Sequence, residues 1–442
     1  MVSASAKLAC DAGIEVVIGL AVQADQGPRR RVSADFLKFW AGQTVSNLGS
    51  SVTFFALPLL VFKLTGSPLN LGATSATTFL PYLLFGLVIG AWVDRVDRKR
   101  LMIASDLTRA LLIAVIPLLA DAGQLRIGWI YVVAFLQSTV TIAFDSAEFA
   151  AIPSLVESKD DLVTANGRIQ ASYYAAQVAG PLLAGLLIAV ISVQQVFWLD
   201  SLSFLLSAAS LAMVRRRFNL ERDAEGEGPR RRAIFREVLE GLRYVLGHPV
   251  LRSISAMMAI INLIGSTVMA QLVLFAKDRL DATDTQVGVL FSAGSIGVVA
   301  LSLAAGRLRR RWPFSKVALS ALVLDGLLTV GLSFTRWYWL ALPLWALSSG
   351  LGILFNINTG SLRQQIVPNE LLGRVISIAG VLAWSAIPIG TLLGGLAIEW
   401  TGNVALVFGV IGALVVAVAL AFSLSPIGHA ERYLEAPAEQ SA

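Results

Sequence analysis

Long apolar segments recur along almost the whole chain, and each has about the 20 residues that a helix needs to cross a lipid bilayer. The chain is 56% hydrophobic and only 14% charged, whereas soluble domains carry about 25% charged residues. A backbone in lipid must satisfy its own hydrogen bonds, and segments of this length do so as helices. The sequence therefore predicts an all-α membrane protein with twelve transmembrane helices. The predicted spans are 36–62, 69–93, 101–120, 126–152, 162–190, 192–214, 251–276, 284–306, 315–334, 338–363, 371–398 and 402–425.

The Lys and Arg residues indicate how these spans are oriented. When the connecting loops are assigned alternately to two sides, nearly all basic residues fall on one side, and such loops face the cytoplasm. We therefore expect a multi-pass protein of the cytoplasmic (inner) membrane, with residues 1–32 and 426–442 as cytoplasmic tails. The chain has a net charge of +6, but its basic residues lie in short runs between apolar segments, as topology signals do. No nucleic-acid partner is therefore expected. The exceptions in the opposite loops are Lys63, Arg126, Lys277, Arg279 and Arg336.

One long polar connection divides the predicted spans into two groups of six. Residues 215–250 begin RRRFNLERDAEGEGPRRR, and apolar residues then recur at helical spacing, which is typical of an amphipathic helix on a membrane surface. The expected domains are an N-terminal half at 33–214, this cytoplasmic linker, and a C-terminal half at 251–425. The residues with helical spacing are Ile234, Val238, Leu242 and Val245.

The two halves resemble each other in sequence. Gly180-Pro-Leu-Leu-Ala-Gly185 in the fifth span matches Gly390-Thr-Leu-Leu-Gly-Gly395 in the eleventh. Gly306-Arg-Leu-Arg-Arg-Arg311 follows the eighth span as Asp94-Arg-Val-Asp-Arg-Lys99 follows the second. Duplicated six-helix halves are typical of transporters whose site lies between the halves. We expect two six-helix pseudo-repeats around such a site.

Glycines four residues apart allow two helices to approach closely. The second span carries Gly86 and Gly90, and the eleventh carries Gly390 and Gly394, so these helices are expected to pack against each other. Asp94 would then lie at the start of the eleventh helix, where the helix dipole stabilises a carboxylate by roughly 0.3–1 kcal/mol. Static packing alone would also explain any one of these glycines.

Two motifs resemble those of major facilitator superfamily transporters. The pattern from Gly90 through Asp94, Arg95 and Arg98 is similar to the loop between the second and third helices, with Asp97 where a Gly is usual. The resemblance implies that these residues gate the cytoplasmic side, although a topology anchor would also need such charges.

The fifth span carries the second motif. Gly180, Pro181 and Gly185 resemble the Gly-Pro motif of the superfamily's proton antiporters, with Ala176 and Ala184 in place of two glycines. Further phrases are similar to bacterial macrolide-efflux and enterobactin-export proteins, and they imply the major facilitator fold, export and drug:proton antiport. These phrases are Gly42-Gln-Thr-Val-Ser46, Leu64-Thr-Gly-Ser67, Asp106-Leu-Thr-Arg-Ala110 and Leu372-Gly-Arg-Val-Ile-Ser377.

Ionisable residues inside the spans need a partner or water, because a charge in the bilayer costs several kcal/mol. Asp106 and Arg109 are three apart and are expected to form a local ion pair. The superfamily lines its cavity with the first, fourth, seventh and tenth helices, which makes Asp145 and Glu148 the main proton-coupling candidates. Asp325 is a third candidate, and Asp200 is interpreted as structural. Neutral polar candidates for the substrate cavity are Gln43, Asn47, Asn262, Gln271, Asn356 and Asn358.

The sequence and the resemblance together predict a secondary exporter of a small amphiphilic molecule, such as a drug, a macrolide-like natural product or a siderophore. It would work as a monomer by alternating access, in exchange for protons. No Gly-Lys pair forms a phosphate-binding loop, which argues against an ATP-driven pump. One Cys and two His give neither a metal site nor a catalytic constellation, so no cofactor and no enzyme activity are expected. An importer or a non-transporting sensor is the alternative.

Overall fold

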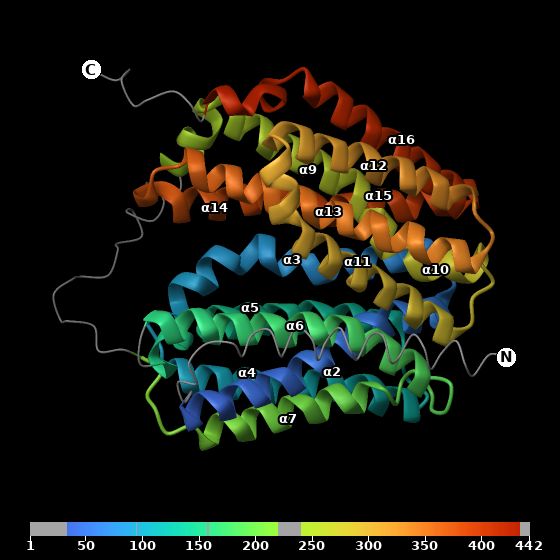
Figure 1. Ribbon diagram of the computed structural model, residues 1–442. Coiled ribbons are helices and arrows are strands. Elements are labelled where there is room, and N and C mark those ends of the chain that lie inside the picture. Colours follow the sequence, from blue (N-terminus) through green and yellow to red (C-terminus); the bar gives the residue numbers. More distant parts are fainter. Residues whose placement is uncertain (1–32, 94, 157–158, 220–239, 434–442) are drawn as a thin grey trace.

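The computed structural model describes residues 33–93, 95–156, 159–219 and 240–433. Every regular element within these ranges is a helix, as the sequence predicts. Figure 1 shows two bundles, one formed by α2 to α7 and the other by α9 to α16, with α3 and α11 lying where the bundles meet. The two bundles are called the N-terminal half and the C-terminal half below.

The helices of the N-terminal half are α2 (Ala34–Thr65), α3 (Pro68–Val93), α4 (Arg98–Asp121), α5 (Ile127–Leu155), α6 (Lys159–Leu187) and α7 (Phe197–Met213). Those of the C-terminal half are α9 (Pro249–Ala270), α10 (Leu272–Asp278), α11 (Asp284–Arg311), α12 (Phe314–Phe334), α13 (Tyr338–Ile366), α14 (Asn369–Trp384), α15 (Ala386–Thr401) and α16 (Val404–Ser423), and the 3-10 helix η1 (Pro426–Tyr433) follows them. In the described part of the chain, nine candidate spans are long and apolar enough to cross a membrane. Helices α3, α6 and α7 occupy the other three predicted spans, and the total of twelve crossings stays a prediction.

Short polar signals fix where several helices begin and end. Ser33 accepts a hydrogen bond from the backbone N–H of Phe36 at 3.1 Å and starts α2. Asp97, which stands where the resembling motif has a Gly, accepts from the N–H of Arg100 at 2.9 Å and starts α4. Gly66 ends α2 in the left-handed conformation, with φ 61°.

Two predicted spans are each divided into two helices. The seventh breaks at Gln271, where φ is −103° and ψ is 7°, and the eleventh breaks at Ser385. Pro388 explains the second break, because proline lacks the N–H that would bond to the carbonyl of Trp384. The spans predicted at 251–276 and 371–398 are thus each occupied by two helices with a break between them.

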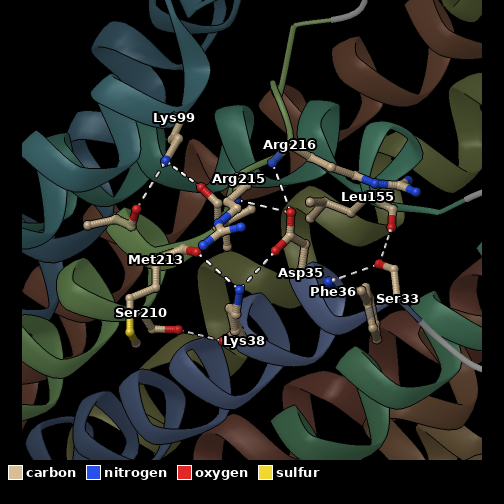
Figure 2. A network of polar contacts seen from close by, with 12 residues as sticks. Ser33, Asp35, Phe36, Lys38, Lys99, Leu155, Ser210, Met213, Arg215 and Arg216 are labelled. Atoms are coloured by element: carbon tan, nitrogen blue, oxygen red, sulfur yellow. Dashed lines mark hydrogen bonds and ion pairs between the residues drawn. The ribbon is translucent and has the colours of Figure 1, made fainter.

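A polar network joins helix ends at the edge of the N-terminal bundle where α4 begins and α7 ends (Figure 2). Lys99 Nζ donates to the carbonyl of Val214 at 2.6 Å, and Lys38 Nζ donates to that of Met213 at 3.2 Å. Asp35 accepts from the backbone N–H groups of Arg215 and Arg216 at 3.0 and 2.9 Å. The network satisfies the terminal carbonyl groups of α7 and fixes the start of the linker.

The linker is attached to both halves. Phe218 is fully buried against Phe39 of α2, with ring centroids 6.1 Å apart. Residues 240–247 are helical, and Val245 is fully buried against Leu251 and Val375 of the C-terminal half. Of the predicted amphipathic helix, Leu242 and Val245 pack in this way, whereas Ile234 and Val238 lie outside the described residues.

Candidate functional site

The described polar contacts between the two halves gather at one end of the molecule. We call it the Lys63 end, and the opposite end, which carries the network of Figure 2, the Arg98 end. At the Lys63 end, Lys63 of α2 forms an ion pair with Asp284 of α11. Glu399 of α15 accepts from the hydroxyl of Ser67 at 3.0 Å, and Gln271 Nε2 donates to the carbonyl of Pro68 at 2.7 Å.

Two glycines let the halves meet backbone to backbone at the Lys63 end. A Cβ on Gly72 of α3 would overlap the carbonyl oxygen of Thr391 of α15. A Cβ on Gly288 of α11 would lie 2.5 Å from the carbonyl oxygen of Pro181 of α6. Each glycine is the fifth residue of its helix, and Thr391 and Pro181 are equivalent in the internal repeat. The closure is therefore built twice, once from each half.

The glycines predicted from spacing have other positions. Gly86 has open space around it, whereas Gly390 and Gly394 pack against Leu263 and Thr267 of α9. Helices α3 and α15 do lie together, but in this structure these three glycines are not their contact. Of the predicted residues in the fifth span, Gly180 packs against Ser51 of α2, and Pro181 and Gly185 face α11.

Two carboxylates of α5 lie near the boundary between the halves. Asp145 is exposed, and Oε1 of Glu148 is buried with no hydrogen-bond partner among the described residues. Tyr82 of α3 lies close enough to interact electrostatically with Asp145, and its ring is edge-on to that of Trp384 in the other half, 6.4 Å away. Asp145, Glu148, Tyr82 and Trp384 are called the acidic site below.

A buried charge network lies behind the acidic site. Asp106 and Arg109 of α4 form the expected ion pair, and the guanidinium lies between the rings of Phe144, 3.9 Å away, and Phe204, 4.4 Å away. Asp200 of α7 is 1% exposed and accepts hydrogen bonds from Thr53 and Ser203 within the bundle. Arg109 also lies close enough to Asp145, Glu148 and Asp200 to interact with them electrostatically. The acidic site and the buried network therefore share this cation.

The neutral candidates divide into two groups. Gln43 is 2% exposed and donates to Ser207 of α7 at 3.2 Å, so it packs inside the N-terminal bundle. Gln271 and Asn358 are also buried, the first as part of the contact between the halves. These three do not line an open surface in this structure. Asn47, Asn262 and Asn356 stay at least partly exposed.

Residues 39–385, more than three quarters of the chain, match the Major Facilitator Superfamily. The chain belongs to the Major Facilitator Superfamily. It is accordingly a membrane transporter and not an enzyme, as the sequence predicts.

Several curated members of the Major Facilitator Superfamily are similar to this transporter in sequence. The multidrug efflux pump Tap of Mycolicibacterium fortuitum is 28% identical over 363 residues, which cover 78% of this chain and 85% of Tap. Macrolide efflux protein A of Streptococcus pyogenes is 28% identical over 368 residues, covering 82% and 88%.

Solved structures confirm the fold. A bacterial homologue of the human lysosomal transporter Spinster, in an inward-facing, unoccupied conformation, has a TM-score of 0.69 at 14% identity, covering 92% of this chain and 98% of that one. A mutant of the nucleoside transporter NupG has a TM-score of 0.72 at 13% identity, covering 88% and 98%.

The predicted gating motif of this major facilitator protein lies at the Arg98 end. Arg95 is exposed, and Arg98 Nη1 donates to the carbonyl of Ala150 near the end of α5 at 3.1 Å. Gly90 lies in the last turn of α3, and Asp94 lies outside the described residues. In this state the described part of the motif contacts the N-terminal half.

Sequence reasoning missed two pairs of residues in the site. Gly72 and Gly288 were identifiable, because each lies five residues after the Ser or Thr that precedes its helix in the two repeats. Tyr82 and Trp384 had no sequence signal, because nothing in a single sequence shows which aromatic residues face the boundary between the halves.

Asp325, the third predicted carrier, accepts from Ser348 Oγ at 2.5 Å and lies inside the C-terminal bundle.

Proposed function

We propose that this transporter exports a small amphiphilic molecule, of the drug or macrolide class, in exchange for protons. The observation that carries the proposal is the acidic site: two carboxylates, for which the described residues supply no ion-pair partner, lie beside the boundary of two halves that meet at one end. The printed functions of Tap and of macrolide efflux protein A support the substrate class and the direction.

The Arg98 end is assigned to the cytoplasm, because the basic loops gather there. With contacts at the Lys63 end, the halves are then closed toward the outside and the acidic site faces the cytoplasm. Substrate enters from that side, and the alternate state opens the Lys63 end. Protons move in the opposite direction through Asp145 and Glu148, which share one face of α5 because they are three residues apart.

The test of this function uses inside-out vesicles that contain the purified protein. An imposed pH gradient, acidic inside, is expected to drive uptake of a fluorescent dye or a radiolabelled macrolide, and a protonophore is expected to abolish the uptake. Protein-free vesicles are the control. Uptake only in right-side-out vesicles would indicate an importer, and no gradient-driven movement in either orientation would contradict transport coupled to protons.

Asp94 is proposed to dock at the start of α14 when the cytoplasmic side closes, where a helix N-terminus stabilises a carboxylate by roughly 0.3–1 kcal/mol. Asp94→Asn is therefore expected to favour the cytoplasm-open state and to lower transport, while dye binding and protein level stay unchanged. Asp97→Asn is the matched control, because Asn at this position still caps α4. Unchanged transport in Asp94→Asn would refute the gate, and reduced folded protein would indicate a structural role.

A further inference from the structure

Arg363, in the last turn of α13, is a buried cation with a poor partner. It is 8% exposed, and its Nη2 contacts the thioether sulfur of Met258 at 3.1 Å. No described carboxylate lies within ion-pair distance of it. A guanidinium has five N–H donors, and a buried charge without a countercharge is strongly unfavourable. In this state the described residues give the Arg363 guanidinium a thioether contact but no carboxylate partner.

Glu148, in the other half, also has a carboxylate oxygen without a partner among the described residues. The charged groups near it include Asp145 on its own helix and Arg109 and Asp106 on α4, and no described ion pair joins Glu148 to Arg363 in this state. Its Oε1 is buried without a donor among the described residues. Among the described residues, one half thus holds a carboxylate and the other a guanidinium for which no ion-pair partner is found.

The internal repeat relates the helices that carry these charges. Helices α5 and α13 each have 29 residues and occupy the same place in their halves. Asp145 corresponds to Asn356, which is exposed, and Arg363 lies seven residues, two turns, beyond Asn356 on the same face. Glu148 corresponds to Thr359, so Arg363 lies one turn, about 6 Å, nearer to the Arg98 end. The two charges therefore lie on equivalent faces at similar depth.

We propose that Arg363 is the ion-pair partner of Glu148 in the state in which the Arg98 ends of the halves meet. This rests on the proposed function, since only alternating access brings α5 and α13 together at that end. An ionised Glu148 pairs with Arg363 and holds the cytoplasmic side closed. A proton on Glu148 removes the countercharge, so the pair separates and the cytoplasmic side opens. Arg363 is thus a positioning residue for proton coupling. The described charged and titratable groups near Glu148 are Asp145, Tyr82, Asp106 and Arg109.

The experiment measures the opening of the Arg98 end directly. Spin labels are placed at Val163 of α6, which is 74% exposed, and at Arg310 of α11, after replacement of Cys10 by serine. In protein with native Glu148 and Arg363, the fraction with the short distance is expected to rise with pH. In Arg363→Gln and in Glu148→Gln this fraction is expected to be low at every pH, and the double variant is expected to resemble either single one.

Two further variants make the outcome decisive. Arg363→Lys keeps the charge and is expected to retain the pH response in part, whereas Arg307→Gln removes an exposed arginine of α11 and is expected to change nothing. A pH response that survives in Arg363→Gln, or additive effects in the double variant, would overturn the pair and leave the proposed function intact. A distance that never shortens at any pH in the native protein would contradict alternating access itself.

Discussion

Replacing Asp145 by Asn and Glu148 by Gln together is expected to reduce pH-driven uptake into inside-out vesicles to the level of protein-free vesicles. The amide side chains keep the size and the hydrogen-bonding capacity of the originals but do not exchange a proton at physiological pH. The two carboxylates are close on one face of α5 and act on each other, so they titrate as a pair. Each single variant is therefore expected to retain part of the coupling.

The matched control is Asp121→Asn at the exposed end of α4, which leaves the acidic site intact and is expected to transport normally. Dye binding by the double variant, measured by fluorescence, separates loss of coupling from loss of folding. If the double variant still couples uptake to the gradient, the carrier lies elsewhere. Asp325 would then be the next residue to replace.

Gly72→Val is expected to hold the transporter open at the Lys63 end. The added Cβ would overlap the carbonyl oxygen of Thr391, and a backbone atom does not rotate away as a side chain does. Overpacking of this kind costs about 1–3 kcal/mol, which lowers the ratio of closed to open protein by about 5-fold to 150-fold. Gly288→Val is expected to act in the same way, since Gly288 meets the carbonyl of Pro181. Labelling of a cysteine at Asn70 by a membrane-impermeant reagent in intact cells measures the opening.

Gly86→Val gives the comparison on the same helix. Gly86 has open space around it in this state, so a valine leaves the Lys63 end closed and the labelling low. If Gly72→Val and Gly86→Val label equally, the glycine contact does not control the closure.

The positions of the helices were predictable because the apolar length of a segment is a local property. Helices stand at all twelve predicted positions, and the ion pair of Asp106 with Arg109 was predictable because its members are three residues apart on one helix. Contacts between helices were harder to predict. The pairing of the second and eleventh helices was expected from Gly86 and Gly390, yet Gly72 and Thr391 form the contact.

Rotation of each helix about its axis explains most of the remaining differences. Gln43 was a cavity candidate because it lies on the first helix, but its face turns toward Ser207 of α7. Gln271 was another, and it crosses between the halves at a helix break that apolar length does not reveal. Arg363 was counted only as a basic residue of a cytoplasmic helix end, since its burial depends on the packing around Met258.

Because the glycine contacts lie near one end of the halves, a small rotation about them causes a large displacement at the other end. Gly72 lies near the start of α3, and Val93 at its other end is 21 residues away, about 30 Å along the axis. A rotation of about 15° about the contact with Thr391 would move the far end of the helix by about 8 Å, before that contact itself separates as the Lys63 end opens. Small movements at the glycine contacts are thus accompanied by an opening at the Arg98 end that is wide enough for an organic molecule.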